Sequence, residues 1–193
     1  MKLSFNRIKK HVIIFLEEGL SPQLYYHGIP HTLYVIKKAQ HIALKEKVSA
    51  KEIELLKIAA LYHDVGFVKT REGHEEESCK IAAKDLKSFG YSQVDIDIIC
   101  EVIMATKVPQ NPTNHLGEIL ADADLEYLAT KHFDSVSDLL YKELKYFNPK
   151  LTKDKWNELQ IDFIGKHNYH TKYCKHYKAF RKNKNLQKLK SNM

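Results

Sequence analysis

The chain has 193 residues, of which 44% are hydrophobic and 28% charged, with 7 glycines and 5 prolines. This length suits one folded domain with a sizeable core, and the composition excludes a low-complexity or collagen-like protein. The cysteines, Cys79, Cys100 and Cys174, are odd in number and widely spaced, which excludes a disulfide framework and a Cys-x-x-Cys zinc site and favours a cytoplasmic location.

The formal net charge of +7 is concentrated at the C-terminus. Residues 166–193 carry nine Lys and Arg residues and no acid, which leaves 22 basic and 24 acidic residues in the rest of the chain. A basic tail over residues 182–193 could attract polyanions such as nucleic acids, but lysines also suit the negative end of a terminal helix, and we expect a solvent-facing helix here. The early apolar run at residues 12–16 is too short to span a membrane, so we expect no membrane partner.

Apolar residues recur at three- and four-residue steps along almost the whole chain, which is typical of amphipathic helices. No segment shows a convincing strand pattern. In chain order, we expect helices over residues 3–18, 31–46, 49–63, 74–89, 92–106, 116–130, 135–147, 153–166 and 172–190. The sequence therefore predicts an all-α bundle of about eight or nine helices.

The end of the third predicted helix has particular importance. This helix begins with a capping box, Ser49-x-x-Glu52, and ends at the doublet His63-Asp64. Neighbouring side chains inside a helix point about 100° apart and would struggle to share one ion, whereas a helix end allows them to converge. Prolines mark a loop over residues 107–114, which could border a pocket because it lies between two helices that carry candidate residues.

The doublet has one suitable partner on each side, His31 upstream and Asp124 downstream. Two neutral imidazoles and two carboxylates would neutralise a divalent cation and leave positions open for a water and a substrate oxygen. A bound cation lowers the pKa of its water towards about 7 and polarises a phosphoryl oxygen, which is hydrolytic chemistry. Taken alone, however, a His-Asp pair is common by chance, and an ordinary solvated helix end is the better interpretation.

The residues around all four positions reverse that judgement. Three motifs occur in this order: Tyr26-His27-x-x-x-His31, Leu61-Tyr62-His63-Asp64-Val65-Gly66, and Ile119-Leu120-Ala121-Asp122-Ala123-Asp124-Leu125. With these motifs the chain resembles the HD superfamily of metal-dependent phosphohydrolases. The resemblance covers about residues 20–130 and extends more loosely to the C-terminal helices. The resemblance implies a single HD-type domain over residues 1–193, with a core at 20–130 and helices at 134–190 packing on it.

The resemblance also implies that His31, His63, Asp64 and Asp124 bind one divalent metal ion. Two nitrogen and two oxygen ligands fit Mn²⁺, Fe²⁺, Co²⁺, Ni²⁺ or Zn²⁺ and do not choose among them. HD proteins with two metals carry further histidines after the doublet, and where the second is expected this chain has Thr106, a poor replacement. His115 is the nearest substitute, and we expect one ion.

Two more histidines are candidates for the proton donor, since imidazole titrates near neutral pH. His27 lies where the cyclic-nucleotide phosphodiesterases, distant HD relatives, have a histidine that protonates the leaving oxygen. His74 resembles the histidine after the doublet that contacts the scissile phosphate or a second metal in several HD hydrolases, and Glu75 is a weaker candidate for orienting water. The alternatives are an exposed loop histidine and an ordinary acidic helix start.

Three further residues have weaker support. Asp122 is two residues from Asp124, a rotation of about 200° on a helix, so we expect it to orient a metal histidine rather than bind the metal. A surface acid is the alternative. Lys107 and Arg181 are candidates for neutralising substrate phosphate by charge and position alone, and a surface role is the stronger interpretation for each.

We therefore expect a metal-dependent hydrolase of a phosphate mono- or diester, with a nucleotide or another small phosphorylated metabolite as substrate. Two alternatives stay open. One is a regulatory module that keeps the ligands and senses a nucleotide without turning it over. The other is a polyanion-binding protein that uses its basic C-terminus and shows a strong salt dependence of affinity.

Overall fold

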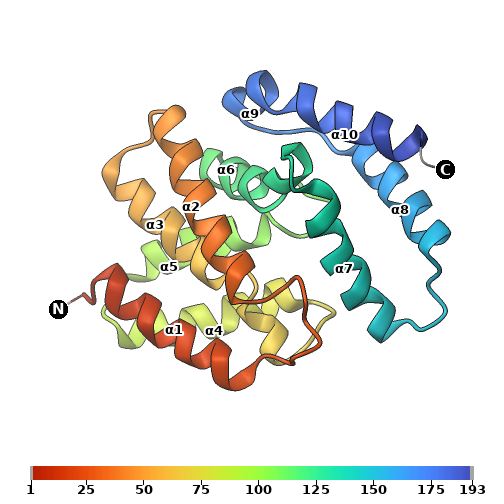
Figure 1. The fold of residues 1–193 in the computed structure, drawn as a ribbon. Coiled ribbons are helices and arrows are strands. Elements are labelled where there is room, and N and C mark those ends of the chain that lie inside the picture. The colour runs from red at the N-terminus through yellow and green to blue at the C-terminus, as the bar shows by residue number, and fades with distance from the viewer. Residues whose placement is uncertain (1, 192–193) are drawn as a thin grey trace.

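The computed structural model describes residues 2–191, and in this part of the chain every regular element is helical (Figure 1). The α-helices are α1 (Phe5–Gly19), α2 (Ile29–Lys45), α3 (Ala50–Tyr62), α4 (His74–Ser88), α5 (Gln93–Met104), α6 (His115–Asp124), α7 (Phe133–Phe147), α8 (Lys153–Lys166), α9 (Lys172–Tyr177) and α10 (Ala179–Ser191). Two 3₁₀ helices, η1 (Val65–Val68) and η2 (Glu126–Ala129), follow α3 and α6. The predicted all-α fold is confirmed. No helix within 2–191 is long and apolar enough to cross a membrane.

Helix α3 lies at the centre of the N-terminal half because its second half, residues 58–62, is apolar all round. Its buried residues include Leu55, Leu56 and the whole run 58–62. A helical segment that is apolar on every side must be covered on every side, and α1, α2, α5 and α6 pack around α3. The predicted capping box at its start is present, with Ser49 and Glu52 each accepting the other's backbone N–H. The doublet at its other end is thereby carried into the interior.

After the doublet, η1 packs against the beginning of α4. A Cβ atom at Gly66 would lie only 2.0 Å from the carbonyl oxygen of His74, so this approach requires glycine. Ser78 Oγ accepts the Gly66 N–H at 2.8 Å and donates to the His63 carbonyl at 2.8 Å. These contacts hold the first turn of α4, with His74, beside the doublet.

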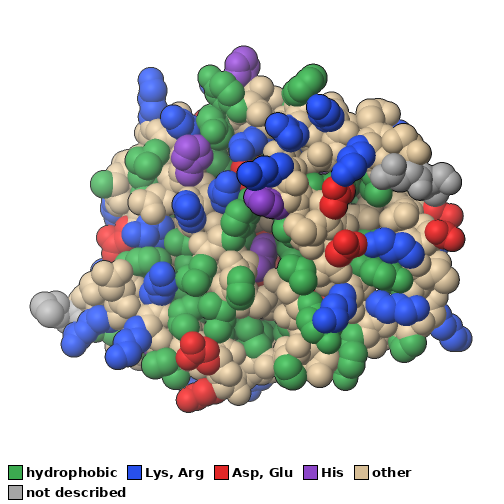
Figure 2. Space-filling view, viewed as in Figure 1, with side chains coloured by type: hydrophobic (Ala, Val, Ile, Leu, Met, Phe, Trp, Pro, Cys, Tyr) green, Lys and Arg blue, Asp and Glu red, His purple; other side chains and the backbone are tan. Residues whose placement is uncertain are grey.

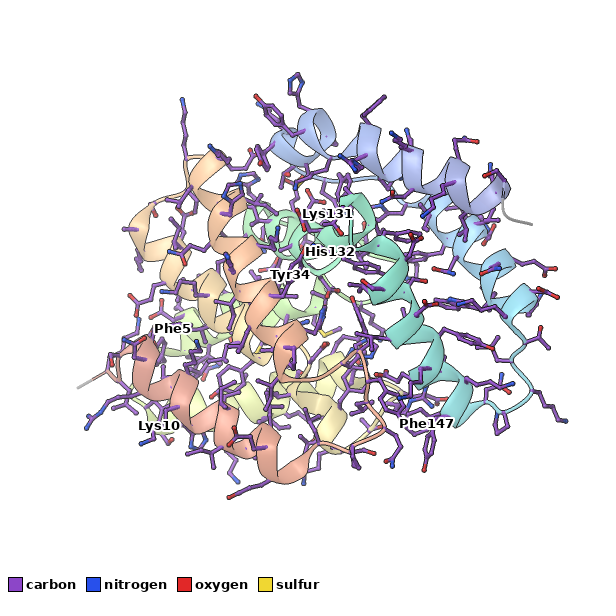
Figure 3. The ribbon with its side chains drawn as sticks, in the orientation of Figure 1. Phe5, Lys10, Tyr34, Lys131, His132 and Phe147 are labelled. Atoms are coloured by element: carbon purple, nitrogen blue, oxygen red, sulfur yellow. The ribbon has the colours of Figure 1, made fainter. Side chains whose placement is uncertain are left out.

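Two predicted helices are interrupted. The helix expected over 116–130 ends at Asp124 and continues as η2, and the one expected over 172–190 is divided into α9 and α10. The first break accompanies the burial of Glu126, whose carboxylate accepts bonds from two lysines and from Tyr34. Figure 3 shows Tyr34 on α2. Asp124 therefore stands at a helix end, as His63 and Asp64 do.

The C-terminal helices build a second apolar cluster around η2, separate from the one around α3. Leu186 of α10 is buried in it, and Asn185 Nδ2 donates to the carbonyls of Leu128 and Thr130 at 2.8 and 3.0 Å. Lys182 is also buried and donates to the carbonyl of Ile164 at 3.1 Å. Helix α10 therefore packs on the body through Lys182 and Leu186, whereas Lys184, Lys188 and Lys190 are exposed, and Lys and Arg side chains gather over the α9–α10 region of the surface (Figure 2).

Candidate metal centre

The four residues predicted to bind a metal converge from three helix ends. The Nε2 atoms of His31 and His63 lie 3.3 Å apart. Asp124 Oδ1 is 3.0 Å from His31 Nε2 and 3.5 Å from His63 Nε2, and Asp64 Oδ2 is 3.5 and 3.2 Å from the same two nitrogens. His31, His63 and Asp124 each offer one atom to a group of the size that holds a metal ion.

Local backbone geometry directs these side chains. His63, the residue after the last turn of α3, has its Nδ1 2.9 Å from the carbonyl of Ala60, and an N–H donated there leaves the Nε2 lone pair facing the site. His31 lies in the first turn of α2, which begins after Gly28 with Pro30 near its start. Both imidazoles therefore present Nε2 to a common point.

The electrostatics of this cluster suit a cation. Although burial opposes a charged imidazole, the Asp64 carboxylate, with Asp124, holds the pKa of His63 well above its usual range. Burial likewise opposes ionised carboxylates, yet the histidines lower the pKa values of Asp64 and Asp124. Asp64 Oδ2 is buried and has no hydrogen-bond partner. An orphaned carboxylate oxygen facing two imidazole nitrogens fits a divalent ion, which would satisfy all of them at once.

Both acid-base candidates lie beside this cluster. His74 Nε2 is 3.5 Å from Asp64 Oδ1, and its Nδ1 is 3.1 Å from the Arg71 carbonyl, an arrangement similar to that of His63. Burial opposes protonation of His74, but Asp64 and then Glu75 raise its pKa above the usual value. The ring of Phe67 stacks on His74 at 3.9 Å and on His27 at 4.4 Å between centroids. Phe67 thus helps hold both histidines.

His27 has a partner that the sequence did not indicate. Its Nδ1 lies 2.5 Å from Glu143 Oε1, and Glu143 Oε2 accepts the backbone N–H groups of Tyr26 and His27 at 2.8 and 3.1 Å. Glu143 belongs to α7 and is 1% exposed. Nothing in the local pattern of α7 separates this glutamate from a surface acid, because its partner is more than a hundred residues away in the chain.

The structure gives Asp122 a different role from the one expected. Its Oδ1 accepts the backbone N–H of His170 at 2.8 Å, and its Oδ2 accepts the N–H and the hydroxyl of Thr171 at 2.9 and 2.6 Å. Burial raises the pKa of Asp122 despite these bonds. Both oxygens are occupied by the segment between α8 and α9, so Asp122 joins the two halves of the molecule rather than orienting a metal histidine.

The remaining candidates are placed as follows. Glu75 is buried and borders the site beside His74. Lys107 is exposed and forms an ion pair with Glu76, and Arg181 is exposed on α10. In the described part of the chain neither basic residue lines the cavity described below, which removes the positional argument for both as phosphate ligands. His115 is half exposed and pairs with Glu118 outside the cavity, so it is not placed to serve a second metal.

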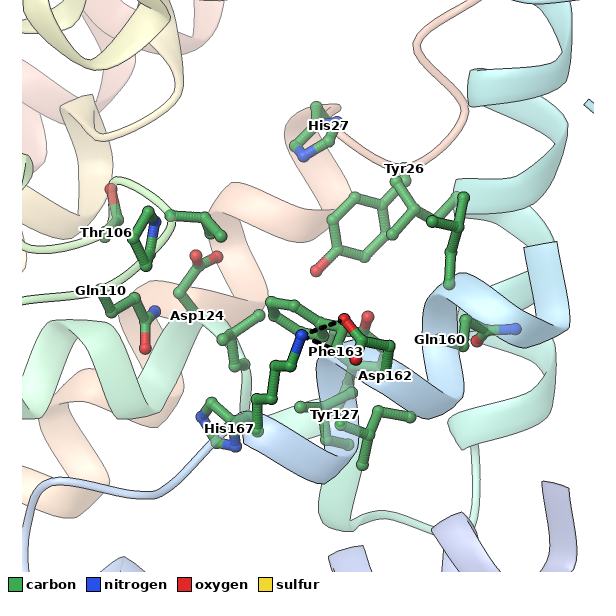
Figure 4. A pocket seen from close by; sticks show the side chains of 18 of the residues that line it. Tyr26, His27, Thr106, Gln110, Asp124, Tyr127, Gln160, Asp162, Phe163 and His167 are labelled. Atoms are coloured by element: carbon green, nitrogen blue, oxygen red, sulfur yellow. Dashed lines mark hydrogen bonds and ion pairs between the residues drawn. The ribbon is translucent and has the colours of Figure 1, made fainter. Parts of the chain in front are cut away.

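A cavity of about 710 Å³ opens from the metal cluster towards the C-terminal half (Figure 4). Asp64, Asp124, His27 and His74 line its metal side, together with Tyr26 and Thr106. Side chains of α7 and α8, including Leu140, Trp156 and Phe163, line the rest. Its volume is in the range of small-molecule sites.

Comparisons with known proteins agree with the all-helical fold. Residues 28–127 match the family model described as HD domain. A crystal structure of a predicted HD superfamily hydrolase from an uncultured Thermotogales bacterium has a TM-score of 0.54 to this chain, with 21% sequence identity, over 81% of this chain and 88% of that one. At this identity the likeness shows a shared fold. No curated protein matches the chain.

Proposed function

This chain belongs to the HD-domain family, and on that premise we propose that it is a metal-dependent phosphohydrolase acting on a phosphate mono- or diester of a nucleotide or another small metabolite. One observation carries the proposal. The four-residue cluster of two imidazoles and two carboxylates borders a cavity of ligand size, with two further imidazoles on the same wall. A purely structural histidine cluster would not need that opening.

A divalent ion held by His31, His63, Asp64 and Asp124 would supply hydroxide near neutral pH and polarise a phosphoryl oxygen. The protein's own contribution is orientation. The contacts of His63 and His74 with backbone carbonyls direct their Nε2 atoms towards the site, and Glu143 holds His27 at Nδ1. Nε2 of His27 or His74 is then available to give a proton to the leaving oxygen, which is the role we assign to these two residues.

The test is metal analysis of the purified protein followed by phosphatase and phosphodiesterase assays with Mn²⁺, Co²⁺ and Ni²⁺. We expect about one ion per chain and metal-dependent release of phosphate or cleavage of a diester. Asp64→Asn, which keeps the side-chain shape but removes the charge, should lose both. Metal content unaffected by this change, or full hydrolysis without metal, would reject the proposal.

The two alternatives lead to different outcomes of the same experiment. A sensing module would bind metal and a nucleotide without turnover. A polyanion-binding protein would bind nucleic acid through its basic helices, but Lys178 and Lys188 already pair with Glu126 and Asp134, and Lys182 is buried against carbonyls. The basic charge of the C-terminus is thus partly used within the protein, which supports the hydrolase over this alternative.

A further inference from the structure

Much of the cavity wall lies outside the part of the chain that matches the family model. The match ends at residue 127, whereas α7, α8 and the segment after α8 supply Leu140, Trp156, Phe163 and His167 to the cavity. Figure 4 shows Phe163 and Gln160 across the cavity from Asp124 and Thr106. The metal side and this wall therefore face one another across a space in which one substrate can contact both.

The wall contains buried polar atoms that have no partner within the protein. Both ring nitrogens of His167 and the Nε1 of Trp156 are shielded from solvent and make no hydrogen bond. The Oε1 of Gln110 is also buried without a partner, but it belongs to the loop between α5 and α6, beside Thr106 on the opposite side of the cavity (Figure 4). Trp156 is 6% exposed. Burial, together with the neighbouring Lys182 and His170, lowers the pKa of His167 to about 4, so its ring is neutral at physiological pH.

A neutral imidazole offers one donor and one acceptor, the indole offers a donor, and the amide oxygen offers an acceptor. Leaving such groups buried and unpaired costs about 1–3 kcal/mol each, so a ligand that pairs with them would gain correspondingly. Around them the surfaces are apolar or aromatic, which suits a flat ring. The complementary group has ring faces and both donor and acceptor atoms.

The charges of the wall limit the rest of the ligand. Among the described residues that line the cavity, Lys166 is the one lysine or arginine, and its ammonium is 2.7 Å from Asp162. A di- or triphosphate would bring several negative charges beyond those that one metal site can offset. The cavity therefore suits a single phosphate at the metal side and an uncharged organic group beyond it.

We propose that the C-terminal helices form the site for the organic part of the substrate, and that the substrate is a phosphate ester with one phosphate and an uncharged aromatic ring bearing hydrogen-bond donors and acceptors. This inference rests on the proposed hydrolase function. His167 and Trp156 are the residues that recognise the ring.

The experiment compares three esters on the metal-loaded protein: adenosine monophosphate, naphthyl phosphate and glycerol phosphate. We expect kcat/KM to decrease in that order, with adenosine monophosphate at least about tenfold above glycerol phosphate, since each paired hydrogen bond is worth several-fold. Equal values for all three would overturn the inference. Equal values for the two ring esters alone would overturn the role of the polar atoms.

His167→Phe removes both ring nitrogens but keeps an aromatic ring against Phe163 and Tyr169. We expect this variant to raise KM for adenosine monophosphate about tenfold while glycerol phosphate hydrolysis stays within about twofold. The matched control is Tyr169→Phe, which removes another buried, unpartnered polar atom that does not line the cavity, and which should leave the ratio of the two substrates unchanged. Equal losses on both esters in His167→Phe would contradict a recognition role.

Failure of this inference can be separated from failure of the hydrolase proposal. If no ester is hydrolysed with any metal, the hydrolase proposal fails, and binding of adenosine to the wild type and to His167→Phe by calorimetry still tests the cavity. Tighter binding to the wild type would support the ring site. Equal binding or none would reject it.

Discussion

The two halves of this molecule contribute to one cavity in different ways. The N-terminal half brings charged ligand atoms together at the ends of α2, α3 and α6, whereas the C-terminal half supplies an apolar wall with neutral polar atoms. Buried carboxylates join them: Asp122 binds the segment before α9, Glu143 binds the loop before α2, and Glu126 binds Lys178 as well as Tyr34 of α2. A buried carboxylate near the site can therefore hold the two halves of the molecule together without taking part in the reaction.

The largest expected effect distinguishes a carboxylate that binds the metal, Asp64, from one that holds the two halves together, Asp122. Asp64→Asn should reduce bound metal and hydrolysis to background, because the carboxylate that balances the ion's charge is gone. Asp122→Asn should instead lower the free energy of unfolding by about 1–3 kcal/mol, since an amide cannot accept all three bonds that Asp122 now accepts. The metal content per folded chain tests the first expectation, and the free energy of unfolding in urea tests the second. Loss of metal in Asp122→Asn at unchanged stability would return Asp122 to the metal site.

The next effect tests whether a histidine of the N-terminal half acts in chemistry. His74→Ala should lower kcat by about 10²–10⁴-fold while metal content stays near the wild-type level, as expected for a general acid. Parallel metal analysis and steady-state kinetics on an ester with a poor leaving group measure this. If metal and rate fall together, His74 is a ligand instead.

A third effect belongs to the C-terminal half and concerns pH. In the unfolded chain His167 takes up a proton near its ordinary pKa of about 6.5, but in the folded protein only near pH 4. Between these values the unfolded state binds more protons, so folding stability decreases as pH falls through this window. We expect this to cost roughly 2 kcal/mol by pH 4, after allowance for partial exposure. Urea unfolding of wild type and His167→Phe at several pH values measures it, and identical pH slopes would contradict a buried neutral histidine.

The smallest effect tests the contact between the halves at His27. Glu143→Gln should lower kcat about tenfold by releasing the ring of His27. Added to His27→Asn, the same change should lower kcat little further, because Glu143 acts through His27. The exposed pair of His115 and Glu118 is the matched control, and Glu118→Gln should change nothing. The values of kcat for the single and double variants show whether Glu143 acts through His27. Full additivity would show that Glu143 acts through stability alone.

Much of the fold followed from local patterns. Helix bounds agreed within a few residues for α1 to α5, because apolar periodicity and caps such as Ser49 are interactions between residues close in sequence. Local patterns missed the break after Asp124, since the burial of Glu126 against distant lysines accompanies it. They also gave no sign that Lys182, in the lysine-rich sequence of α10, is buried.

The sequence by itself determined which residue types could bind a metal and that His63 and Asp64 stand at a helix end. Only the tertiary structure decided which acids face the site. Asp122 and Asp124 differ by two positions on one helix, and the neighbours that each side chain meets come from segments dozens of residues away. The same holds for Glu143 with His27 and for the cavity wall. Contacts of this kind depend on how whole helices pack, and that packing is set by the sum of many weak apolar contacts rather than by any local motif.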